Sequence, residues 1–322
     1  MRVMFWGLQH HSPKVDASLR RIEGIELAVV TSEADAIREA GMADALVITP
    51  NRYTDAVERA VLLAGRVRLV QLLSAGFDGL LARTFPQGAT IATAGDSLAP
   101  AVAEHAIALA LALVRRLDVA LVNQSRELWD RGPFAQIGSL DGKSAAVVGF
   151  GAIGKAIATR LRAFGVRVTG VSRTGEPDPA ADEMQPIAAI DNVLAGADFV
   201  FIALPASAET ENLFDRERLE GCRGGAIVVN VARGKIVDNI ALADALNAGI
   251  LGGAALDVTD PEPLPQGHPL WRAKNVVITP HYGGIGGQER VAEFVAANLE
   301  RLRKGLPLSS VIDLARQGSA LG

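Results

Sequence analysis

The stretch Ala145-Ala146-Val147-Val148-Gly149-Phe150-Gly151-Ala152-Ile153-Gly154 joins a short apolar run to an alanine-rich segment. Its glycines have the spacing GxGxxG. In this motif the first glycine makes a tight turn, the second lets the backbone approach a pyrophosphate, and the third lets the helix pack on the strand. The N-terminus of the helix then faces the anion. A tight turn without a ligand is the alternative. The strand before the motif and the helix after it favour a dinucleotide-binding turn.

Short apolar runs alternate with helical stretches on both sides of this turn. Continuous apolar strands in such an alternation indicate a parallel sheet that is covered on both faces. Upstream, we expect strands at Val3–Trp6, Glu26–Val30, Ala45–Thr49, Val67–Leu73 and Thr90–Ala92, and helices at Lys14–Ile22, Glu33–Ala40 and Asp55–Ala64. From the turn onward, we expect strands at Ala145–Gly149, Val166–Val171, Phe199–Leu204, Ala226–Val231, Gly253–Asp257 and Asn275–Thr279, and helices at Ala152–Phe164, Ile187–Ala195 and Asn239–Asn247.

A long helix is predicted from about Ser97–Pro100 to Val122, because proline is well tolerated in the first turn of a helix. The next segment, Asn123–Ser139, is polar and aromatic and is expected to leave the helical pattern. The last helix, about Gln288–Lys304, is expected to have no strand after it. We therefore expect two α/β units in series.

Composition narrows the class of protein. The chain has 322 residues, with Lys+Arg 32 and Asp+Glu 36, and 49% of its residues are apolar. At roughly 100–200 residues per domain, this length predicts two domains, and the apolar content excludes wholesale disorder. The formal net charge of −4 argues against nucleic-acid binding, which needs a basic surplus.

Cysteine and hydropathy bear on the compartment. The single cysteine, Cys222, excludes an intramolecular disulfide or a Cys-rich zinc site and fits a reducing compartment. The longest apolar stretch, Ala106–Val114, is far shorter than the ~20 residues that span a bilayer. The adjacent pair His10-His11 is expected to be solvated, and no metal site is expected. We therefore expect a cytoplasmic protein without a membrane or nucleic-acid partner.

Three side chains that could do chemistry, Arg233, Glu262 and His281, each follow an apolar strand. Ligands bind outside the carboxyl ends of the strands in open parallel sheets, so these side chains should converge. Arginine can hold a carboxylate and polarise a carbonyl, and histidine can move a proton near neutral pH. A carboxylate beside a histidine favours its protonated form and orients it. The set matches reduction of a 2-oxo acid by a nicotinamide. The alternative is three unrelated loop residues.

The segment Leu140-Asp141-Gly142-Lys143, which leads into the glycine motif, resembles the D-isomer-specific 2-hydroxyacid dehydrogenase family. The match covers about residues 65 to 300. Further segments follow in the family's order: Val102-Ala103-Glu104-His105, Asn230-Val231-Ala232-Arg233-Gly234, Ala255-Leu256-Asp257-Val258, Pro261-Glu262-Pro263-Leu264-Pro265, and His268-Pro269-Leu270-Trp271 running to Thr279-Pro280-His281.

This resemblance implies an NAD(P)-dependent oxidoreductase that acts on a 2-hydroxy acid. The expected fold is α/β, with a Rossmann dinucleotide-binding domain at 99–286 and a discontinuous flavodoxin-like substrate domain at 1–98, to which the C-terminal helix segment 287–322 returns. Both domains would be doubly wound parallel sheets. By resemblance, Arg233 binds the substrate, Glu262 is the acidic partner and His281 is the acid/base.

The same resemblance assigns the binding residues. Ser74, Ala75 and Gly76 look like the loop whose backbone N–H groups hold the substrate carboxylate, and a glycine turn without a ligand is the alternative. Ser before Ala-Gly is similar to glyoxylate and hydroxypyruvate reductases. Asp257 would contact the nicotinamide carboxamide, and Leu204-Pro205 would lie on the adenosine side. The full expected cofactor set is Gly149, Gly151, Ala152, Ile153, Gly154, Ser172, Arg173, Thr174, Leu204, Pro205, Val231, Ala232, Arg233, Asp257, His281 and Gly283.

One departure from the family pattern concerns the choice of cofactor. NAD enzymes usually carry Asp or Glu at the end of the second Rossmann strand, where it binds the ribose 2′-OH. Here that strand ends in Ser172-Arg173-Thr174, and the first acid is Glu176. Ser172 and Thr174 can donate to phosphate oxygens, and Arg173 can pair with a 2′-phosphate or stack on adenine. We therefore expect NADP to be preferred over NAD. The alternative is that Arg173 is solvated and both cofactors bind.

Other functions stay open. The family fold also serves as a low-turnover, nucleotide-sensing corepressor, and related enzymes use formate, phosphite or a phosphorylated hydroxyacid. A phosphorylated substrate would need an extra cation near Ser74, where Arg52 is the candidate. His105 is expected to be an interdomain helix residue rather than a proton shuttle. Trp129 and Phe134 predict a homodimer, because an aromatic arm needs a second surface to cover it and family members commonly pair through this region.

Overall fold

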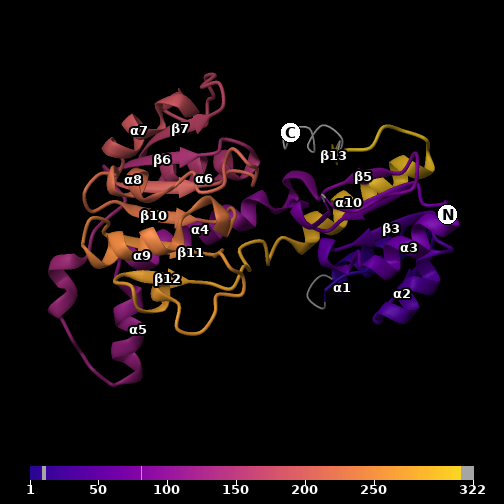
Figure 1. Cartoon of the computed structure of the whole chain (residues 1–322), viewed down its shortest axis with the longest axis horizontal. Coiled ribbons are helices and arrows are strands. Elements are labelled where there is room, and N and C mark those ends of the chain that lie inside the picture. The colour runs from indigo at the N-terminus through magenta and orange to yellow at the C-terminus, as the bar shows by residue number, and fades with distance from the viewer. Residues whose placement is uncertain (9–11, 81, 313–322) are drawn as a thin grey trace. The chain divides into compact units, whose positions relative to one another are not determined.

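The computed structural model describes residues 1–8, 12–80 and 82–312, so the pair His10-His11 lies outside the described residues. The chain divides into two compact units, each of which is described by itself (Figure 1). Unit 1 combines Met1–Leu98 with the part of the chain that begins at Ile285, and unit 2 is Ala99–Gly284.

Unit 1 is built on a six-stranded sheet in the order β13-β5-β4-β3-β1-β2. The strands are β1 (Arg2–Trp6), β2 (Glu26–Val29), β3 (Ala45–Ile48), β4 (Leu69–Leu72), β5 (Thr90–Ala92) and β13 (Val311–Ile312). The first five are parallel in the order 2-1-3-4-5, which is typical of flavodoxin-like folds. The predicted flavodoxin-like topology is confirmed.

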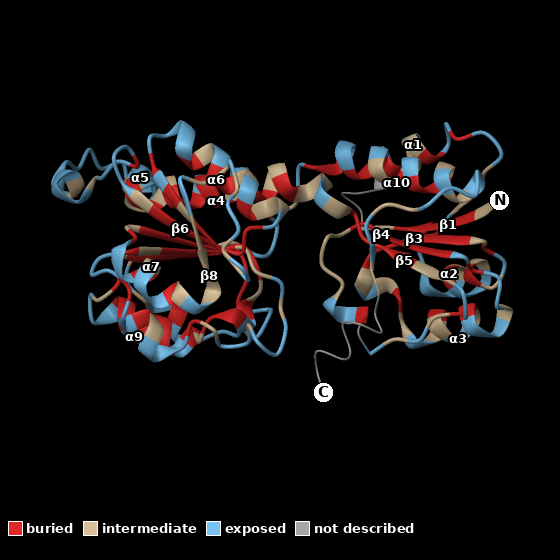
Figure 2. Ribbon diagram, turned by 90° about the horizontal axis from the view of Figure 1, so that it is seen from above, coloured by how far each residue is buried: buried red, intermediate tan, exposed pale blue. Residues whose placement is uncertain are grey.

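Helices cover both faces of this sheet (Figure 2). On one face α1 (Ser12–Leu19) packs with α10 (Gln288–Arg303), and on the other α2 (Glu33–Ala40) packs with α3 (Asp55–Ala64). Three short 3-10 helices, η1 (Pro50–Arg52), η2 (Asp78–Leu80) and η3 (Gly95–Leu98), lie in its loops. Because both faces are covered, β3 and β4 are entirely buried, as their apolar runs predict.

Unit 2 is built on a seven-stranded parallel sheet in the order β12-β11-β10-β9-β6-β7-β8. The strands are β6 (Ser144–Val148), β7 (Arg167–Ser172), β8 (Glu183–Pro186), β9 (Phe199–Ile202), β10 (Ile227–Asn230), β11 (Gly253–Leu256) and β12 (Val276–Ile278). Counted from β6, this is the Rossmann order 3-2-1-4-5-6 with a seventh strand added. The predicted Rossmann fold is confirmed.

The helices of unit 2 also form two layers. In Figure 2, α4 (Ala99–Val114) and α6 (Ala152–Ala163) lie on one face of the sheet, and α7 (Ile190–Gly196) and α9 (Asn239–Asn247) lie on the other. The remaining elements are α5 (Leu117–Ser125), α8 (Arg216–Glu220), η4 (Gly132–Gln136), η5 (Ile187–Ala189), η6 (Gly234–Ile236) and η7 (Pro269–Arg272). This layering leaves the carboxyl ends of β6, β7, β9, β10, β11 and β12 to carry the loops of the site.

The long helix that was expected to reach Val122 is in fact two helices. α4 ends at Val114, and Arg116 has a left-handed φ of 53° directly before α5. The Arg116 guanidinium donates to Asn275 Oδ1 at 2.7 Å and to Asp118 Oδ2 at 3.0 Å. These side-chain contacts of Arg116 hold the chain at the point where the helix is interrupted. The pattern of apolar residues does not predict such contacts, so the sequence predicts one continuous helix.

The sequence pattern also misses three short elements. β8 (Glu183–Pro186) is an edge strand without an apolar run, and α8 (Arg216–Glu220) is little more than one turn, capped by Asp215. β13 contradicts the expectation that no strand follows the last helix, because Val311 and Ile312 pair antiparallel with β5. Two residues at a sheet edge are too few to show a period of two.

One helical stretch, Gly95–Val114, is long and apolar enough by length and composition to cross a membrane. Within it, α4 packs on α6 and on β10, β11 and β12. The side chains of Val102, Ile107, Leu109 and Leu113 are buried in this packing. The apolar composition of α4 is therefore accounted for by its place in the core of unit 2.

Candidate active site

The glycine turn lies between β6 and α6, as the motif predicts. Gly149 has φ 97°, and a Cβ there would lie 2.5 Å from the carbonyl group of Ala203. A Cβ on Gly154 would overlap the carbonyl oxygen of Gly149. A Cβ on Gly151 would meet nothing within 4 Å, and Gly151 is the N-cap of α6 without a side-chain capping bond. Open space therefore adjoins free N–H groups at a helix N-terminus, which is a fitting cradle for a pyrophosphate.

The end of β7 presents hydroxyls and a guanidinium. Ser172 Oγ accepts a hydrogen bond from Gly175 N at 3.0 Å, so the hydroxyl proton of Ser172 stays available for donation. Arg173 and Thr174 are exposed, and the first acid beyond them, Glu176, is exposed as well. Within the described part of the chain, Arg173 forms no ion pair. The tip of β7 is thus suited to an anionic group.

Leu204 and Pro205 follow β9 and lie beside the glycine turn. A Cβ on Gly149 would be 2.7 Å from Leu204 N, so the two backbones are in contact. Thr210 Oγ1 donates to Pro205 O at 2.8 Å and fixes the following loop. The structure therefore brings these two residues to the edge of the sheet that carries Gly149.

Arg233, Glu262 and His281 follow three neighbouring strands. β10, β11 and β12 are adjacent and in register, with Asn230 opposite Leu256 and Leu256 opposite Ile278. All three loops therefore leave the same edge of the sheet at the same level. The predicted convergence of the three strand ends agrees with this register.

The loop that carries Arg233 is held by Asn230, a residue that the motif analysis did not single out for a role. The buried Asn230 side chain accepts from Ala232 N and donates to Arg233 O, each at 3.0 Å. Val231 and Ala232 are buried, and the half-buried Arg233 donates from Nη1 to Ala232 O at 2.7 Å. In the sequence, the position of the polar Asn230 at the end of an apolar strand is the signal that could have indicated this role.

The loop after β10 also touches the loop after β11. The backbone of Gly234 packs against the carbonyl of Thr259, and Asn239 Nδ2 donates to Asp260 O at 2.7 Å. Thr259 Oγ1 donates to Pro261 O at 3.0 Å. These contacts fix the start of the segment that leads to Glu262.

His281 and Glu262 form a short hydrogen-bonded pair. His281 Nδ1 lies 2.6 Å from Glu262 Oε1, and the side chains are 48% and 43% exposed. Because an ionised carboxylate only accepts hydrogen bonds, the proton of this contact lies on Nδ1. The other nitrogen of the imidazole, Nε2, makes no hydrogen bond among the residues that the structure describes. The predicted pairing of these two residues is present in the structure.

Asp257, at the end of β11, is buried, and both of its carboxylate oxygens accept hydrogen bonds. Its Oδ1 accepts from Thr279 Oγ1 at 2.6 Å and Tyr282 N at 3.1 Å, and its Oδ2 accepts from Gly283 N at 2.9 Å. Burial raises the pKa of the Asp257 carboxyl, but hydrogen bonds from His105, Thr279 and Gly283 N outweigh it and hold that pKa below its ordinary value. Asp257 is thus an ionised anchor for the loop that carries His281.

Unit 1 carries the predicted carboxylate loop at the end of β4. Ser74 Oγ donates to Gly76 O at 2.7 Å. The backbone N–H groups of Ser74, Ala75 and Gly76 donate to no acceptor among residues 1–8, 12–80 and 82–312. A row of backbone donors without protein acceptors is a feature of anion-binding loops.

Arg52, in η1, lies at the same edge of the sheet of unit 1. Its guanidinium carbon is 4.9 Å from the ring centroid of Trp6, and its Nε is buried without a hydrogen-bond partner. Register places Trp6 opposite Ile48 and Ile48 opposite Leu72, so the ends of β1, β3 and β4 are level. Arg52 therefore stands at the strand ends from which the Ser74 loop also leaves.

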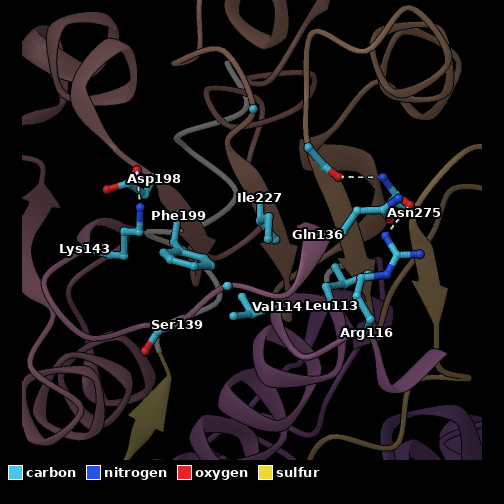
Figure 3. A pocket seen from close by; sticks show the side chains of 13 residues that line it. Leu113, Val114, Arg116, Gln136, Ser139, Lys143, Asp198, Phe199, Ile227 and Asn275 are labelled. Carbon is cyan, nitrogen blue, oxygen red and sulfur yellow. Dashed lines mark hydrogen bonds and ion pairs between the residues drawn. The ribbon is translucent and has the colours of Figure 1, made fainter. Parts of the chain in front are cut away.

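A separate hollow of about 360 Å³ lies at the opposite, amino end of the sheet in unit 2 (Figure 3). Phe199 and Ile227, at the starts of β9 and β10, form part of its wall. Its cations are already paired, since Arg116 bonds to Asn275 and Lys143 Nζ lies 4.0 Å from Asp198. This hollow is remote from the glycine turn and does not include the predicted site residues.

Comparison with known proteins points to one family. The model of the NAD-binding domain of D-isomer specific 2-hydroxyacid dehydrogenases matches residues 107–283. The chain is 37% identical to a glyoxylate reductase of Thermococcus kodakarensis over 251 residues, which cover 75% of each chain. It is 35% identical over 283 residues to a D-3-phosphoglycerate dehydrogenase of Mycobacterium tuberculosis, covering 87% of this chain but only 52% of that protein.

A solved structure agrees over nearly the whole length. A D-isomer specific 2-hydroxyacid dehydrogenase family protein from Aeromonas salmonicida superposes with a TM-score of 0.86 and 31% identity, covering 97% of this chain and 99% of that one. The family indicated by the sequence comparisons therefore agrees with the observed fold and with the glycine turn between β6 and α6. This chain belongs to the D-isomer-specific 2-hydroxyacid dehydrogenase family and is an NAD(P)-dependent hydroxyacid dehydrogenase.

Proposed function

We propose that the chain catalyses reversible hydride transfer between NADP(H) and C2 of a small 2-oxo or 2-hydroxy acid, with glyoxylate or hydroxypyruvate as the favoured oxo acid. The observation that carries this proposal is the contact of 2.6 Å between His281 Nδ1 and Glu262 Oε1 at the sheet edge that carries Arg233. The similarity to a glyoxylate reductase supports the choice of small substrates.

The dinucleotide would be held by residues of unit 2. The N–H groups around Gly151, Ala152, Ile153 and Gly154 would bind the pyrophosphate. Leu204 and Pro205 would contact the adenosine side. When bound, the nicotinamide supplies a hydride to C2 of the oxo acid, or accepts one from C2 of the hydroxy acid. The nicotinamide-binding position would be lined by Val231, Ala232 and Gly283. Asp257 Oδ2 accepts one hydrogen bond from the protein and would accept another from the carboxamide of the nicotinamide.

The chain's own residues handle the substrate and the proton. In unit 1, the N–H groups of Ser74, Ala75 and Gly76 would bind a substrate carboxylate. In unit 2, the fork of Arg233 would bind the substrate and polarise its C2 carbonyl. In reduction, His281 releases the proton on Nε2 to the C2 oxygen, which becomes a hydroxyl, and in oxidation it takes that proton back. Glu262 accepts a hydrogen bond from Nδ1 and so holds the orientation of the imidazole.

We assign the preference for NADP to the tip of β7. A carboxylate at this place would accept from the ribose 2′-OH and repel a 2′-phosphate. Ser172 and Thr174 can instead donate to phosphate oxygens, and Arg173 supplies a positive charge. These three side chains support NADP over NAD.

The assembly that fits this chain is a homodimer. Figure 1 shows α5 and the segment after it standing out from the rest of unit 2. The apolar side chains of this region are exposed to solvent: Trp129 is 90%, Leu121 65% and Phe134 63% exposed. A second copy of this chain would cover them. Light scattering should give twice the mass of one chain, and Trp129→Glu should lower it. A wild-type monomer at micromolar concentration would contradict this proposal.

The compartment that fits this chain is the cytoplasm. Cys222 is buried and unpaired, and burial raises the pKa of its thiol to about 11. Such a thiol is neither cross-linked nor reactive, which suits a reducing environment.

A second candidate substrate is a 2-oxo acid with a terminal phosphate or carboxylate. Arg52 favours it, because this guanidinium lies over Trp6 at the strand ends of unit 1 and forms no ion pair with any residue that the structure describes. An anion at the far end of such a substrate would supply the missing partner. The similarity to a D-3-phosphoglycerate dehydrogenase is in line with this candidate.

The test is a substrate panel with both cofactors. Glyoxylate, hydroxypyruvate, pyruvate, 2-oxoglutarate and 3-phosphohydroxypyruvate would each be assayed with NADPH and NADH, in the wild type and in His281→Ala. We expect turnover of glyoxylate and hydroxypyruvate, and we expect His281→Ala to abolish it. Preference for the two acids with a second anionic group, 2-oxoglutarate and 3-phosphohydroxypyruvate, would favour the second candidate if Arg52→Leu removes it and the surface control Arg66→Leu does not. Cofactor binding without turnover of any acid would refute both and favour a corepressor.

A further inference from the structure

The loop that carries His281 is fastened to one buried carboxylate. Besides the hydrogen bonds to its side chain, Asp257 accepts the His281 N–H on its backbone oxygen at 2.8 Å. His281 itself has a left-handed φ of 53°. Residues other than glycine keep such a backbone only where their surroundings impose it. The direction of the His281 imidazole therefore depends on how firmly Asp257, Thr279 and Gly283 are held.

His105 reaches this anchor from a different element. It lies on α4, and its Nε2 is 2.9 Å from Thr279 Oγ1 and 3.2 Å from Asp257 Oδ1. Thr279 donates its only hydroxyl proton to the carboxylate, so its oxygen can only accept from His105. Asp257 also only accepts. The proton must therefore lie on His105 Nε2, and the neutral tautomer is sufficient for this bond.

The ring of His105 also packs on the residues that follow His281. It lies 5.2 Å from the ring of Tyr282, centroid to centroid, with the planes tilted by 60°. A Cβ on Gly283 would come within 3.0 Å of His105 Cδ2 and 2.8 Å of Asp257 Oδ2. One side chain from α4 therefore touches Thr279, Tyr282 and Gly283, on both sides of His281.

We propose that His105 is a positioning residue for the acid–base histidine. It contacts no reacting atom, and it acts by holding Thr279 and Asp257, which hold the loop. A proton relay does not fit, because His281 Nδ1 is bonded to Glu262, and no hydrogen bond in the described parts of the chain joins the side chains of His105 and His281. This inference rests on the proposed role of His281 in the reaction.

Two pairs of variants test it. His105→Leu removes the donor and keeps an apolar body, whereas His105→Gln keeps an N–H donor at the end of a side chain of similar reach. Thr279→Val and Thr279→Ser make the same comparison at the other end of the bond. Displacing a reacting group by about 1 Å can cost about 100-fold in rate. We expect His105→Leu and Thr279→Val to lower kcat about 10- to 100-fold, with Kd for the cofactor nearly unchanged.

The conservative variants separate positioning from simple packing. His105→Gln and Thr279→Ser should recover most of kcat, and the double variant His105→Leu/Thr279→Val should be little worse than either single one. Without any substrate, amide hydrogen exchange at Tyr282 and Gly283 should quicken in His105→Leu and not in His105→Gln.

Three results would overturn the proposal: wild-type kcat in His105→Leu, equal impairment of His105→Gln and His105→Leu, or unchanged exchange at both amides. Failure of the proposed function has a different signature, since the wild type itself would then turn over no 2-oxo acid.

Discussion

Replacement of Gly151 by alanine separates cofactor binding from folding. Gly151 has φ −79° and ψ −162°, an extended backbone that alanine adopts freely, and its Cβ would meet nothing within 4 Å. Gly151→Ala should therefore stay within about 1 kcal/mol of the wild type, since a slightly poorer helix cap is offset by a less flexible unfolded chain. The new methyl group would stand in the space beside the N-terminus of α6, where the pyrophosphate would be bound.

The loss of binding can be estimated from the bonds at stake. Each hydrogen bond from a backbone N–H to a charged oxygen contributes about 1.5–3 kcal/mol, so losing one should raise Kd for NADPH about 10- to 150-fold. Gly154→Ala is the matched contrast, because its Cβ would overlap the carbonyl oxygen of Gly149. That variant should lose about 1–3 kcal/mol or more of folding free energy.

Urea unfolding followed by circular dichroism and calorimetric titration with NADPH measure the two effects separately. If Gly151→Ala binds NADPH as tightly as the wild type, the pyrophosphate does not lie at this turn. If Gly154→Ala is as stable as Gly151→Ala, the packing of strand, turn and helix is not as described.

Three further variants address single side chains. Arg233→Ala should lower kcat/KM about 10²–10³-fold while Kd for NADPH persists, and near wild-type turnover would end its assignment to the substrate. Arg173→Ala should raise KM for NADPH about 10- to 150-fold and leave KM for NADH nearly unchanged, and an equal effect on both would remove its role in selecting the phosphate. Asp257→Asn should destabilise unit 2 by about 3–5 kcal/mol near neutral pH, unlike the exposed control Asp260→Asn, in urea unfolding. Because folding lowers the pKa of Asp257, the ionised carboxylate stabilises the fold at pH values above its unfolded-state pKa of about 3.9. This stabilisation is lost as pH falls through the folded-state pKa. The free energies of unfolding of the wild type and Asp257→Asn should therefore converge in acid.

The features that the sequence predicts best are those with a local cause. The turn from Gly149 to Gly154 has its own spacing, and the buried strands of both sheets are continuous apolar runs. The pairing of His281 with Glu262 follows from their places beyond neighbouring strands, because strand order brings distant loops to one edge. The periodicity of apolar residues and the spacing of motifs are sufficient to predict such features from the sequence.

The features that escape prediction depend on tertiary contacts. Arg116 interrupts the long helix while bonded to Asn275, which lies far along the chain, and β8 gains strand structure only by pairing with β7. The bond between His105 and Thr279 likewise joins two elements that are distant in sequence. No local pattern encodes these partners, so only the folded chain brings them together.

Reduction of hydroxypyruvate with NADPH that carries deuterium at both hydrogen positions of nicotinamide C4 tests the proposed chemistry most directly. We expect wild-type protein to yield the 2-hydroxy acid with the deuterium on C2, as read by mass spectrometry, because the hydride passes directly between the two carbons. His281→Ala, which should still bind NADPH, should give little product. A product without deuterium on C2, or full turnover in His281→Ala, would contradict the assigned transfer and the assigned proton donor.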